Sequence, residues 1–304
     1  MTKRAPSNVA ASVHSRLLNQ ARETAKPFND LLQHYALERF LFRLSHSDFS
    51  SKFILKGALL LRVWEVSSIR PTRDIDLLGK THNDLERVRS IIQQLCVATV
   101  NDDGMSFDAE SIRAAFIAED AEYEGIRIEF TGRLGNARIP MQIDIGFGDR
   151  VTPAPTIIEY PTVLASGPIR LLAYTPETTI AEKFQVMLSR GLLNSRMKDY
   201  FDIWALAKAR QYDGQLLAEA IATTCTQRKT AVSQTPSALS KAMGDDEQRR
   251  IQWTAFRRRL QPTDAPESLD ELVAAVARFL SPVANALATH APFKHQWTPG
   301  GPWA

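Results

Sequence analysis

The chain has 304 residues, of which 44% are hydrophobic, so it can form two domains or one large domain with a sizeable core. Its formal net charge of +3 is mildly basic, which permits a nucleic-acid or nucleotide partner without demonstrating one. No apolar run approaches the roughly 20 residues that span a bilayer, and no secretory signal begins the sequence. Cys96 and Cys225 are too few and too far apart to indicate a disulfide framework or a metal site, which favours a reducing cytoplasm. Without an apolar run of spanning length, we expect no membrane partner.

The first part of the chain is predicted to be helical. Apolar residues recur at helical spacing over 8–23 and 28–46, and Pro27 fits the first turn of the second helix. No chemistry is evident in either helix. We therefore expect residues 1–47 to form a structural N-terminal segment.

The next stretch has the order strand, glycine turn, short helix. Residues 53–55 form a short apolar strand, Lys56, Gly57 and Ala58 follow, and residues 59–64 form an apolar helix. A turn of this kind presents backbone N–H groups at a helix start, which suits a phosphate. A single glycine is equally compatible with a plain turn.

After a short turn at Ser67-Ser68, the run from Ile69 to Lys80 carries two carboxylates one residue apart. On a strand, Asp74 and Asp76 leave the same face. Two ionised aspartates repel each other, so a fold that pairs them usually places a cation between them. Oxygen ligands in this arrangement suit Mg²⁺. The alternative is a solvated strand end with two surface acids.

An amphipathic helix is predicted over 83–100, with Asn83 or Thr81 as its cap. Alternation and β-branched content predict strands over 106–118, 124–131 and 137–147, with turns at Glu124-Gly125 and from Gly132 to Asn136. These hairpin-sized spacings predict a mixed or antiparallel sheet rather than a doubly wound one.

Asp144 lies within the last of these strands and faces away from its apolar neighbours, together with Gln142. An ionised carboxylate at such a position is costly unless it is paired or bound to a metal. If this strand lies beside the one with Asp74 and Asp76, Asp144 is a third carboxylate in the same cluster. The alternative is an ion pair with Arg138 or Arg127.

Residues 151–168 are rich in proline and are predicted to be a connector, followed by a short strand over 169–173. Thr175 and Pro176 then supply the cap and first position of a helix. Lys183 sits at the edge of the buried stripe of that helix, where a lysine either reaches solvent or binds an anion.

A further helix is predicted over 198–210, and Asp199 and Asp202 share one of its faces because they lie three residues apart. Lys198 and Asp202 are four apart, so a surface ion pair is the structural alternative. With Arg196, these groups concentrate charge of both signs at one helix start.

The remainder is predicted to be helical over 214–226, 236–243, 245–260 and 267–288. The arginine-rich stretch 249–259 contains aromatic residues, a composition that can indicate RNA binding. Trp253, Phe256 and Leu260 fall on one helical stripe, however, so core packing is the favoured interpretation.

Several short motifs occur in a characteristic order. They are the glycine turn at Gly57, Arg70-x-Thr72-x-Asp74-x-Asp76, Asp144 in Ile-Asp-Ile-Gly-Phe-Gly-Asp, Ala181-Glu182-Lys183, and Ser195-Arg196-Met197-Lys198-Asp199-Tyr200-Phe201-Asp202. Together they resemble the AbiEii-type nucleotidyltransferases, toxins of abortive-infection toxin–antitoxin pairs and a branch of the polymerase-β-like superfamily. The resemblance covers roughly residues 50–210.

The resemblance implies an α+β fold with a polymerase-β-like nucleotidyltransferase core and a mixed β-sheet. The N-terminal helices over 1–47, the core over 48–175 and a C-terminal helical domain over 176–304 would be its parts. It also implies Mg²⁺-dependent transfer of a nucleotide from an NTP to an acceptor hydroxyl. In some family members the acceptor is the 3′ end of tRNA, and a cognate antitoxin protein would be a partner.

The same resemblance assigns residues to roles. The metal ligands would be Asp74, Asp76 and Asp144. The nucleotide would contact Lys56, Gly57, Ala58, Arg70, Thr72, Lys183, Arg196 and Lys198. The catalytic set would be Asp74, Asp76, Asp144, Lys183, Asp199 and Asp202, and either of the last two could be the critical acid. Many superfamily members have serine after the turn glycine, so Ala58 removes a hydroxyl contact to the phosphate.

The chemistry fits these roles without the family name. Phosphoryl-type transfer needs a neutralised leaving group and an aligned attacking oxygen, and two Mg²⁺ ions roughly 3.5–4 Å apart provide both. Asp74 and Asp76 would bridge them, and Asp144 could accept the proton of the attacking hydroxyl. Lys183 and Arg196 would stabilise the triphosphate.

Two alternatives remain open from the sequence. One is a nucleotidyltransferase that modifies a protein or a small molecule, which uses the same chemistry. The other is a non-catalytic binding module on the same fold. Ala58 favours the module slightly, whereas the joint presence of Asp74, Asp76, Asp144 and Lys183 favours the enzyme, and Mg²⁺-dependent NTP binding would discriminate between them.

Overall fold

The computed structural model describes residues 8–66, 70–119, 123–164, 167–260 and 264–304, so the predicted turn at Ser67-Ser68 and Ile69 lie outside the described residues. The chain forms two compact units. The first comprises residues 1–59, 71–148 and 157–173, and the second comprises 60–70, 149–156 and 174–304. The division at residues 47 and 175 stays a prediction.

Seven strands among the described residues form one mixed sheet, in the order β3-β4-β5-β2-β1-β7-β6. Their bounds are β1 (Phe53–Lys56), β2 (Asp74–Gly79), β3 (Met105–Glu119), β4 (Tyr123–Leu134), β5 (Ala137–Phe147), β6 (Thr156–Tyr160) and β7 (Ile169–Ala173). β2 is parallel to β5 and antiparallel to β1. The predicted mixed sheet is therefore confirmed.

Two predictions about this region are wrong. Gly125, predicted in a turn, lies inside β4, because the β3–β4 ladder continues as far as the pair Glu119 and Tyr123. The predicted connector over 151–168 contains strand β6, whose Thr-Ile-Ile run favours an extended backbone despite the prolines around it.

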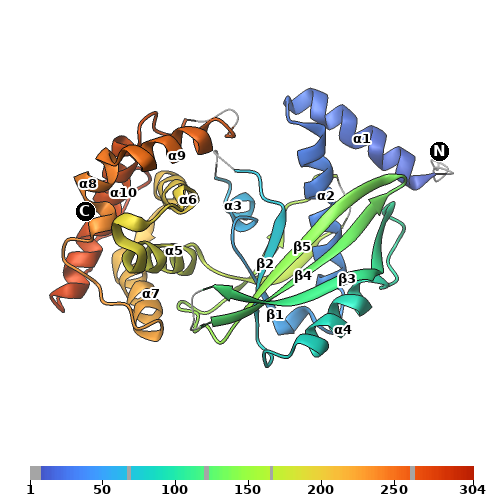
Figure 1. Cartoon of the computed structure of the whole chain (residues 1–304), viewed down its shortest axis with the longest axis horizontal. Helices are drawn as coiled ribbons and strands as arrows, with labels where there is room; N and C mark the ends of the chain where they lie inside the picture. The colour runs from blue at the N-terminus through green and yellow to red at the C-terminus, as the bar shows by residue number, and fades with distance from the viewer. Residues whose placement is uncertain (1–7, 67–69, 120–122, 165–166, 261–263) are drawn as a thin grey trace. The chain divides into compact units, whose positions relative to one another are not determined.

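Helices cover one face of the sheet in the first unit. α2 (Phe28–Ser45) contacts β5 and β7, α4 (Leu85–Cys96) contacts β3, and α1 (Val9–Thr24) packs against α2. A short 3₁₀ turn, η1, covers Ser50–Lys52. Figure 1 shows α4 lying along the β3–β4 part of the sheet. On α2, Phe40 meets Phe107 of β3 and Phe130 of β4, with ring centroids 5.5 and 5.3 Å apart. The apolar residues of β5 are buried, so its polar residues occupy the other face.

The cap of α4 differs from the prediction. The side chain of Asp84 accepts a hydrogen bond of 3.0 Å from the backbone N–H of Arg87, so Asp84 is the cap rather than Asn83 or Thr81. Since aspartate is as good a cap as asparagine, composition alone did not separate these neighbours.

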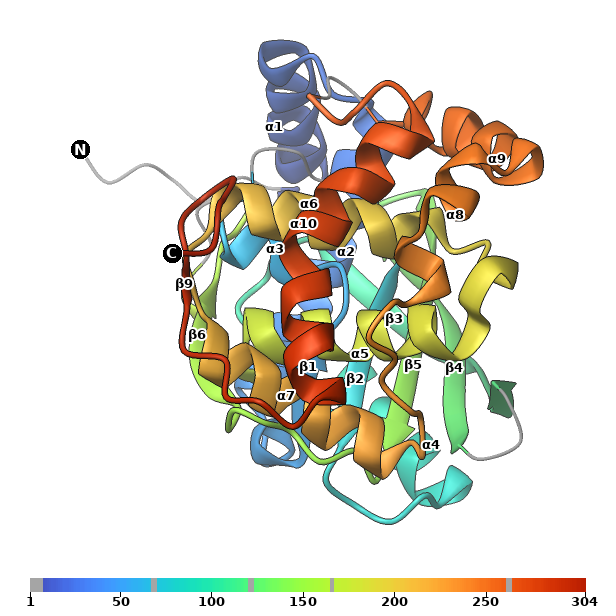
Figure 2. The same cartoon turned by 90° about the vertical axis from the view of Figure 1, so that its left-hand side faces the viewer.

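The second unit is mainly helical. Its helices are α3 (Leu60–Val63), α5 (Pro176–Arg190), α6 (Met197–Ala209), α7 (Gly214–Gln227), α8 (Lys241–Asp245), α9 (Glu247–Arg257) and α10 (Leu269–Ala288). Two 3₁₀ turns, η2 (Gly191–Leu193) and η3 (Ser237–Leu239), and a small sheet of β8 (Tyr212–Asp213) and β9 (Gln296–Trp297) complete it. In Figure 2, α10 crosses this unit and packs against α6, α7 and α8. The predicted cap Thr175 and first residue Pro176 of α5 are confirmed.

Among the described residues, α10 alone is long and apolar enough to cross a membrane by length and composition. This corrects the expectation that no apolar run approaches such a length. One helix of this kind is weak evidence, because the core helix of a globular unit passes the same test. Leu272, Val276 and Leu280 are fully buried against neighbouring helices, as in such a core helix.

Candidate active site

Three carboxylates meet on the polar face of the sheet in the first unit. Asp74 and Asp76 leave the same face of β2, and Asp144 leaves β5 beside them. In the parallel β2–β5 ladder, Asp76 is opposite Asp144 and Asp74 is opposite Gln142. One oxygen from each carboxylate lies within 4.8 Å of the others, and all three residues are half-buried. We call these three residues the acidic triad.

Two cations flank the triad along one row of the sheet. Lys56 of β1 is opposite Asp76, and Arg127 of β4 is opposite Asp144. Arg127 donates to both oxygens of Asp144, from Nε over 2.8 Å and from Nη2 over 2.7 Å. The ion pair between Asp144 and Arg127, predicted as an alternative to the acidic cluster, is therefore present. Asp144 also belongs to the triad, so the two predictions hold together. Arg138 lies opposite Arg133 instead.

The close approach of Asp76 requires glycine at position 57. Its φ of +77° lies in the left-handed region, and a Cβ placed there would lie 1.9 Å from Oδ2 of Asp76. The backbone of the turn therefore lies directly against Asp76 of the triad. Any residue other than glycine at position 57 would clash with that carboxylate. The following helix, α3, is a single turn, so a helix-dipole contribution to phosphate binding has little support. Ala58 is buried, with 4% of its surface exposed.

Thr72 orients the first carboxylate of the triad. Its hydroxyl donates to Oδ1 of Asp74 over 2.5 Å, and the backbone N–H of Arg73 donates to the same oxygen over 3.3 Å. The structure thus places Thr72 against Asp74, although the family resemblance assigns this residue to the nucleotide.

The triad fits a divalent metal. Carboxylate oxygens are the ligands that Mg²⁺ prefers, and each carboxylate offers about four lone-pair sites. The bonds from Thr72 and Arg127 hold Asp74 and Asp144 in place. Asp74, Asp76 and Asp144 are therefore the residues that would hold the ion.

The second unit contains a different charged group, which we call the basic cluster: Arg70, Lys183, Asp199, Asp202 and Arg196. Lys183 of α5 reaches both acids of α6, with its Nζ 3.2 Å from Asp199 and 2.7 Å from Asp202. Arg70 donates to both oxygens of Asp202, over 2.9 and 3.1 Å. Arg196 donates to Asp199 from Nε over 2.7 Å. The two acids are fully buried.

The local structure of α6 determines where the two acids of the basic cluster point. Asp199 and Asp202 are three residues apart on α6, so both face the same side of that helix. The side chain of Asn194 accepts from the backbone N–H of Arg196 over 3.1 Å and thereby fixes the start of α6. Lys198 is exposed and has no ion pair among the described residues, so the predicted surface pair with Asp202 is absent there.

Burial and pairing act against each other within the cluster. Burial disfavours the ammonium ion of Lys183, but Asp202 and Asp199 outweigh burial and raise the pKa of Lys183. Burial likewise favours protonation of Asp202, but Arg70 and Lys183 outweigh it and lower the pKa of Asp202. Both groups are therefore charged at neutral pH.

Sequence reasoning underestimated three residues. Arg127 was considered only as an alternative partner of Asp144, yet it is part of the triad's row. Gln142, noted only as sharing the face of Asp144, donates to that carboxylate over 3.2 Å. Asn194 was not singled out, although asparagine just before a helix is a recognisable signal for a side chain that accepts from the backbone N–H two residues further on.

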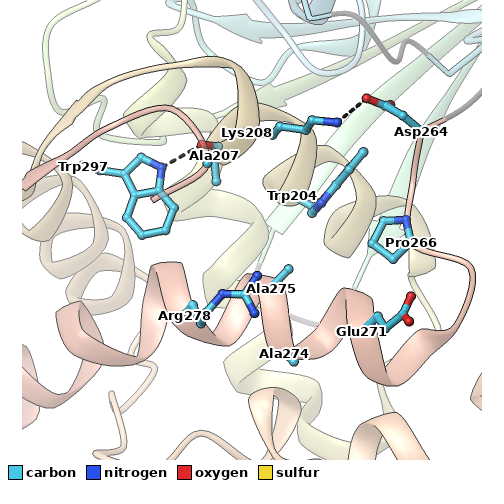
Figure 3. A pocket seen from close by; sticks show the side chains of 11 residues that line it. Trp204, Ala207, Lys208, Asp264, Pro266, Glu271, Ala274, Ala275, Arg278 and Trp297 are labelled. Atoms are coloured by element: carbon cyan, nitrogen blue, oxygen red, sulfur yellow. Dashed lines mark hydrogen bonds and ion pairs between the residues drawn. The ribbon is translucent and has the colours of Figure 1, made fainter. Parts of the chain in front are cut away.

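A cavity of about 500 Å³ lies elsewhere in the second unit. Trp204, Lys208, Arg278 and Trp297 are among its lining residues, and none of the predicted site residues lines it (Figure 3). The indole N–H of Trp297 donates to the carbonyl of Ala207, and Lys208 pairs with Asp264. These bonds stabilise the fold around the cavity.

A protein-family profile matches most of the chain. The profile of the nucleotidyl transferase AbiEii toxin family, of type IV toxin–antitoxin systems, matches residues 39–275. Among curated proteins, none matches the chain significantly.

Two solved structures are similar in outline. JHP933 from Helicobacter pylori has a TM-score of 0.48 at 12% identity, and the match covers 86% of this chain and 92% of that one. A second H. pylori protein, described as a candidate nucleotidyltransferase, has a TM-score of 0.44 at 14% identity and covers 86% and 95%.

The family match extends over most of the sequence and includes every residue of the acidic triad and the basic cluster. It confirms the resemblance found in the sequence motifs, and with the mixed sheet it confirms the predicted polymerase-β-like α+β fold. The chain therefore belongs to the AbiEii nucleotidyl transferase toxin family.

Proposed function

We propose that this nucleotidyltransferase moves a nucleotide from an NTP to a hydroxyl of RNA, with the 3′ end of tRNA as the expected acceptor. The reaction is Mg²⁺-dependent, and the protein acts in the cytoplasm as the toxin paired with a cognate antitoxin. The observation that carries this proposal is the acidic triad, in which three half-buried carboxylates converge within 4.8 Å. Carboxylates gathered in this way repel each other unless a cation joins them.

Asp74, Asp76 and Asp144 hold the metal in this proposal. Bound there, Mg²⁺ would supply charge neutralisation at the phosphates and a fixed orientation of the nucleotide. Thr72 keeps Asp74 in position, and Arg127 does the same for Asp144. Asp144 is in addition the group we assign to accept the proton of the acceptor hydroxyl.

The basic cluster supplies positive charge for the triphosphate. Lys183, Arg70 and Arg196 present two guanidinium groups and one ammonium group, the groups that bind phosphate oxygens most strongly. Transfer of a phosphoryl-type group depends mainly on such electrostatic stabilisation and on positioning.

The test is transfer of label from each of the four NTPs to total RNA, and separately to a protein lysate. Wild-type protein is expected to label RNA with one preferred NTP, and Asp76→Asn is expected to abolish that labelling. Asp108→Asn is the matched control, because Asp108 is a half-buried aspartate of the same sheet that lies outside the triad.

Undiminished labelling by Asp76→Asn would refute the metal assignment. Label on protein, with none on RNA, would refute the acceptor class while leaving the transfer chemistry standing.

A further inference from the structure

We propose that Asp199 and Asp202 are positioning residues that assemble Arg70, Lys183 and Arg196 into a preformed polyphosphate site. The two acids then act through the cations they hold rather than as metal ligands or proton acceptors. The identity of the phosphate, an NTP triphosphate, rests on the proposed function, whereas the assembled site rests on the contacts themselves.

The contacts form an alternating chain of charge. In order, the groups are Arg70, Asp202, Lys183, Asp199 and Arg196, and each neighbouring pair is 3.2 Å apart or less. Lys183 occupies the centre and uses two of its three N–H donors on the two acids. Each of the three cations in this row of charged groups is therefore fixed by at least one carboxylate.

Burial places the acids beneath the cations. Asp199 and Asp202 have no exposed side-chain surface, whereas the side chains of the three cations keep 12–27% exposure. An approaching solute thus meets positive groups first.

The acids themselves are occupied. Both oxygens of Asp202 accept from Arg70, and one of them also faces Lys183. The two oxygens of Asp199 face Lys183 and Arg196. A metal ion at either acid would lie against these cations and be repelled, so an anion is the ligand that the cluster favours.

The test is binding of inorganic tripolyphosphate to the full chain by calorimetry, with EDTA present to exclude metal. Wild-type protein is expected to bind. Asp202→Asn and Arg70→Met are each expected to weaken the affinity by at least about tenfold. The first removes the carboxylate that fixes Arg70 and Lys183 in place, and the second removes one of the cations that bind phosphate. The double variant is expected to bind tripolyphosphate no more weakly than the weaker of the two single variants, since both changes break the same ion pair.

Asp149→Asn is the matched control. Asp149 is an aspartate of the second unit with only 8% of its side chain exposed, and both of its oxygens accept from Arg228 over 3.1 Å. It should lose stability and keep tripolyphosphate affinity. If Asp202→Asn does not fold, Arg70→Met alone decides, because Asp202 then keeps Lys183 as its partner.

A second readout separates positioning from metal binding. Asp202→Asn should leave the affinity for Mn²⁺ unchanged, whereas a metal ligand would lose it. Absence of tripolyphosphate binding by wild-type protein, or weaker Mn²⁺ binding by Asp202→Asn, would overturn the inference. Tripolyphosphate binding without any nucleotide transfer would refute the proposed function and leave this inference intact.

Discussion

The two charged groups of this protein differ in how deeply their carboxylates are buried. In the acidic triad the carboxylates are half-buried on a sheet face, and Asp144 keeps 21% of its side chain exposed. In the basic cluster the carboxylates are fully buried, while the cations keep 12–27% exposure. In the proposed function the two groups take opposite ligands, a metal ion at the triad and a phosphate at the basic cluster.

Burial also determines how much each group contributes to stability. A buried ion pair that loses one partner leaves an uncompensated charge, whereas a half-exposed pair is compensated by water. We therefore expect the basic cluster to be a structural support of the second unit. The triad should contribute little to the stability of the first unit and be retained for its ligand.

The largest expected effect is on folding stability. Asp202→Asn should lower the free energy of unfolding by about 3–5 kcal/mol, because Arg70 and Lys183 both lose a buried partner. Asp144→Asn should lower it by no more than about 1 kcal/mol, since its ion pair is half-exposed. Urea titrations of both variants measure this difference, and equal losses would contradict the comparison.

Gly57→Ala should be next in size. The added methyl would overlap Asp76, and alanine is strained at a positive φ, so the carboxylate must move. We expect Mn²⁺ binding and nucleotide transfer to fall by roughly a hundredfold, as a displaced ligand atom would require. Gly148→Ala is the control, because its φ of +80° is similar and nothing lies within 4 Å of its Cβ. Equal loss in both variants would attribute the effect to backbone strain.

The pH dependence of stability should reveal the basic cluster. The pKa of Asp202 is lowered by folding, so its contribution is present above the ordinary value of about 3.9 and is lost as pH falls through the folded pKa. The pKa of Lys183 is raised, so its contribution is present below about 10.4 and is lost as pH rises through the folded pKa. Melting temperature against pH should thus fall at both extremes, and Asp202→Asn should flatten the acid limb. An unchanged acid limb in that variant would disprove the assignment.

The smallest effect concerns the row that flanks the triad. Arg127 is paired with Asp144 and repels a divalent ion there, so Arg127→Met should tighten Mn²⁺ binding by roughly fivefold or less. Arg133→Met is the matched control, since Arg133 is on the same strand with the same 39% exposure and pairs with Asp108. Weaker Mn²⁺ binding by Arg127→Met would show that holding Asp144 in place matters more than competing with the ion.

Features that depend on local periodicity could be predicted from the sequence. Asp74 and Asp76 share a face because side chains alternate along a strand, and Asp144 was recognisable as a charge within an apolar strand. The Thr175 cap and the position of Lys183 at the edge of its helical stripe also follow from local spacing.

Features that depend on contacts between distant parts of the chain could not be predicted from the sequence. The sequence offered a local pair between Lys198 and Asp202 as an alternative, but α6 turns Asp202 inward to Arg70, which is 132 residues away. The approach of Gly57 to Asp76 likewise depends on the antiparallel pairing of β1 and β2, which no local pattern reports. The site residues were therefore easier to name than their partners.

The long separation between Arg70 and Asp202 has a consequence for synthesis of the protein. A ribosome adds about 5–20 residues per second, so several seconds pass between the synthesis of Arg70 and that of Asp202. During that interval the nascent chain can complete β2, and later the acidic triad, but it lacks the buried acids that organise its cations. A translation product that stops before α6 should therefore be harmless to the cell that makes it.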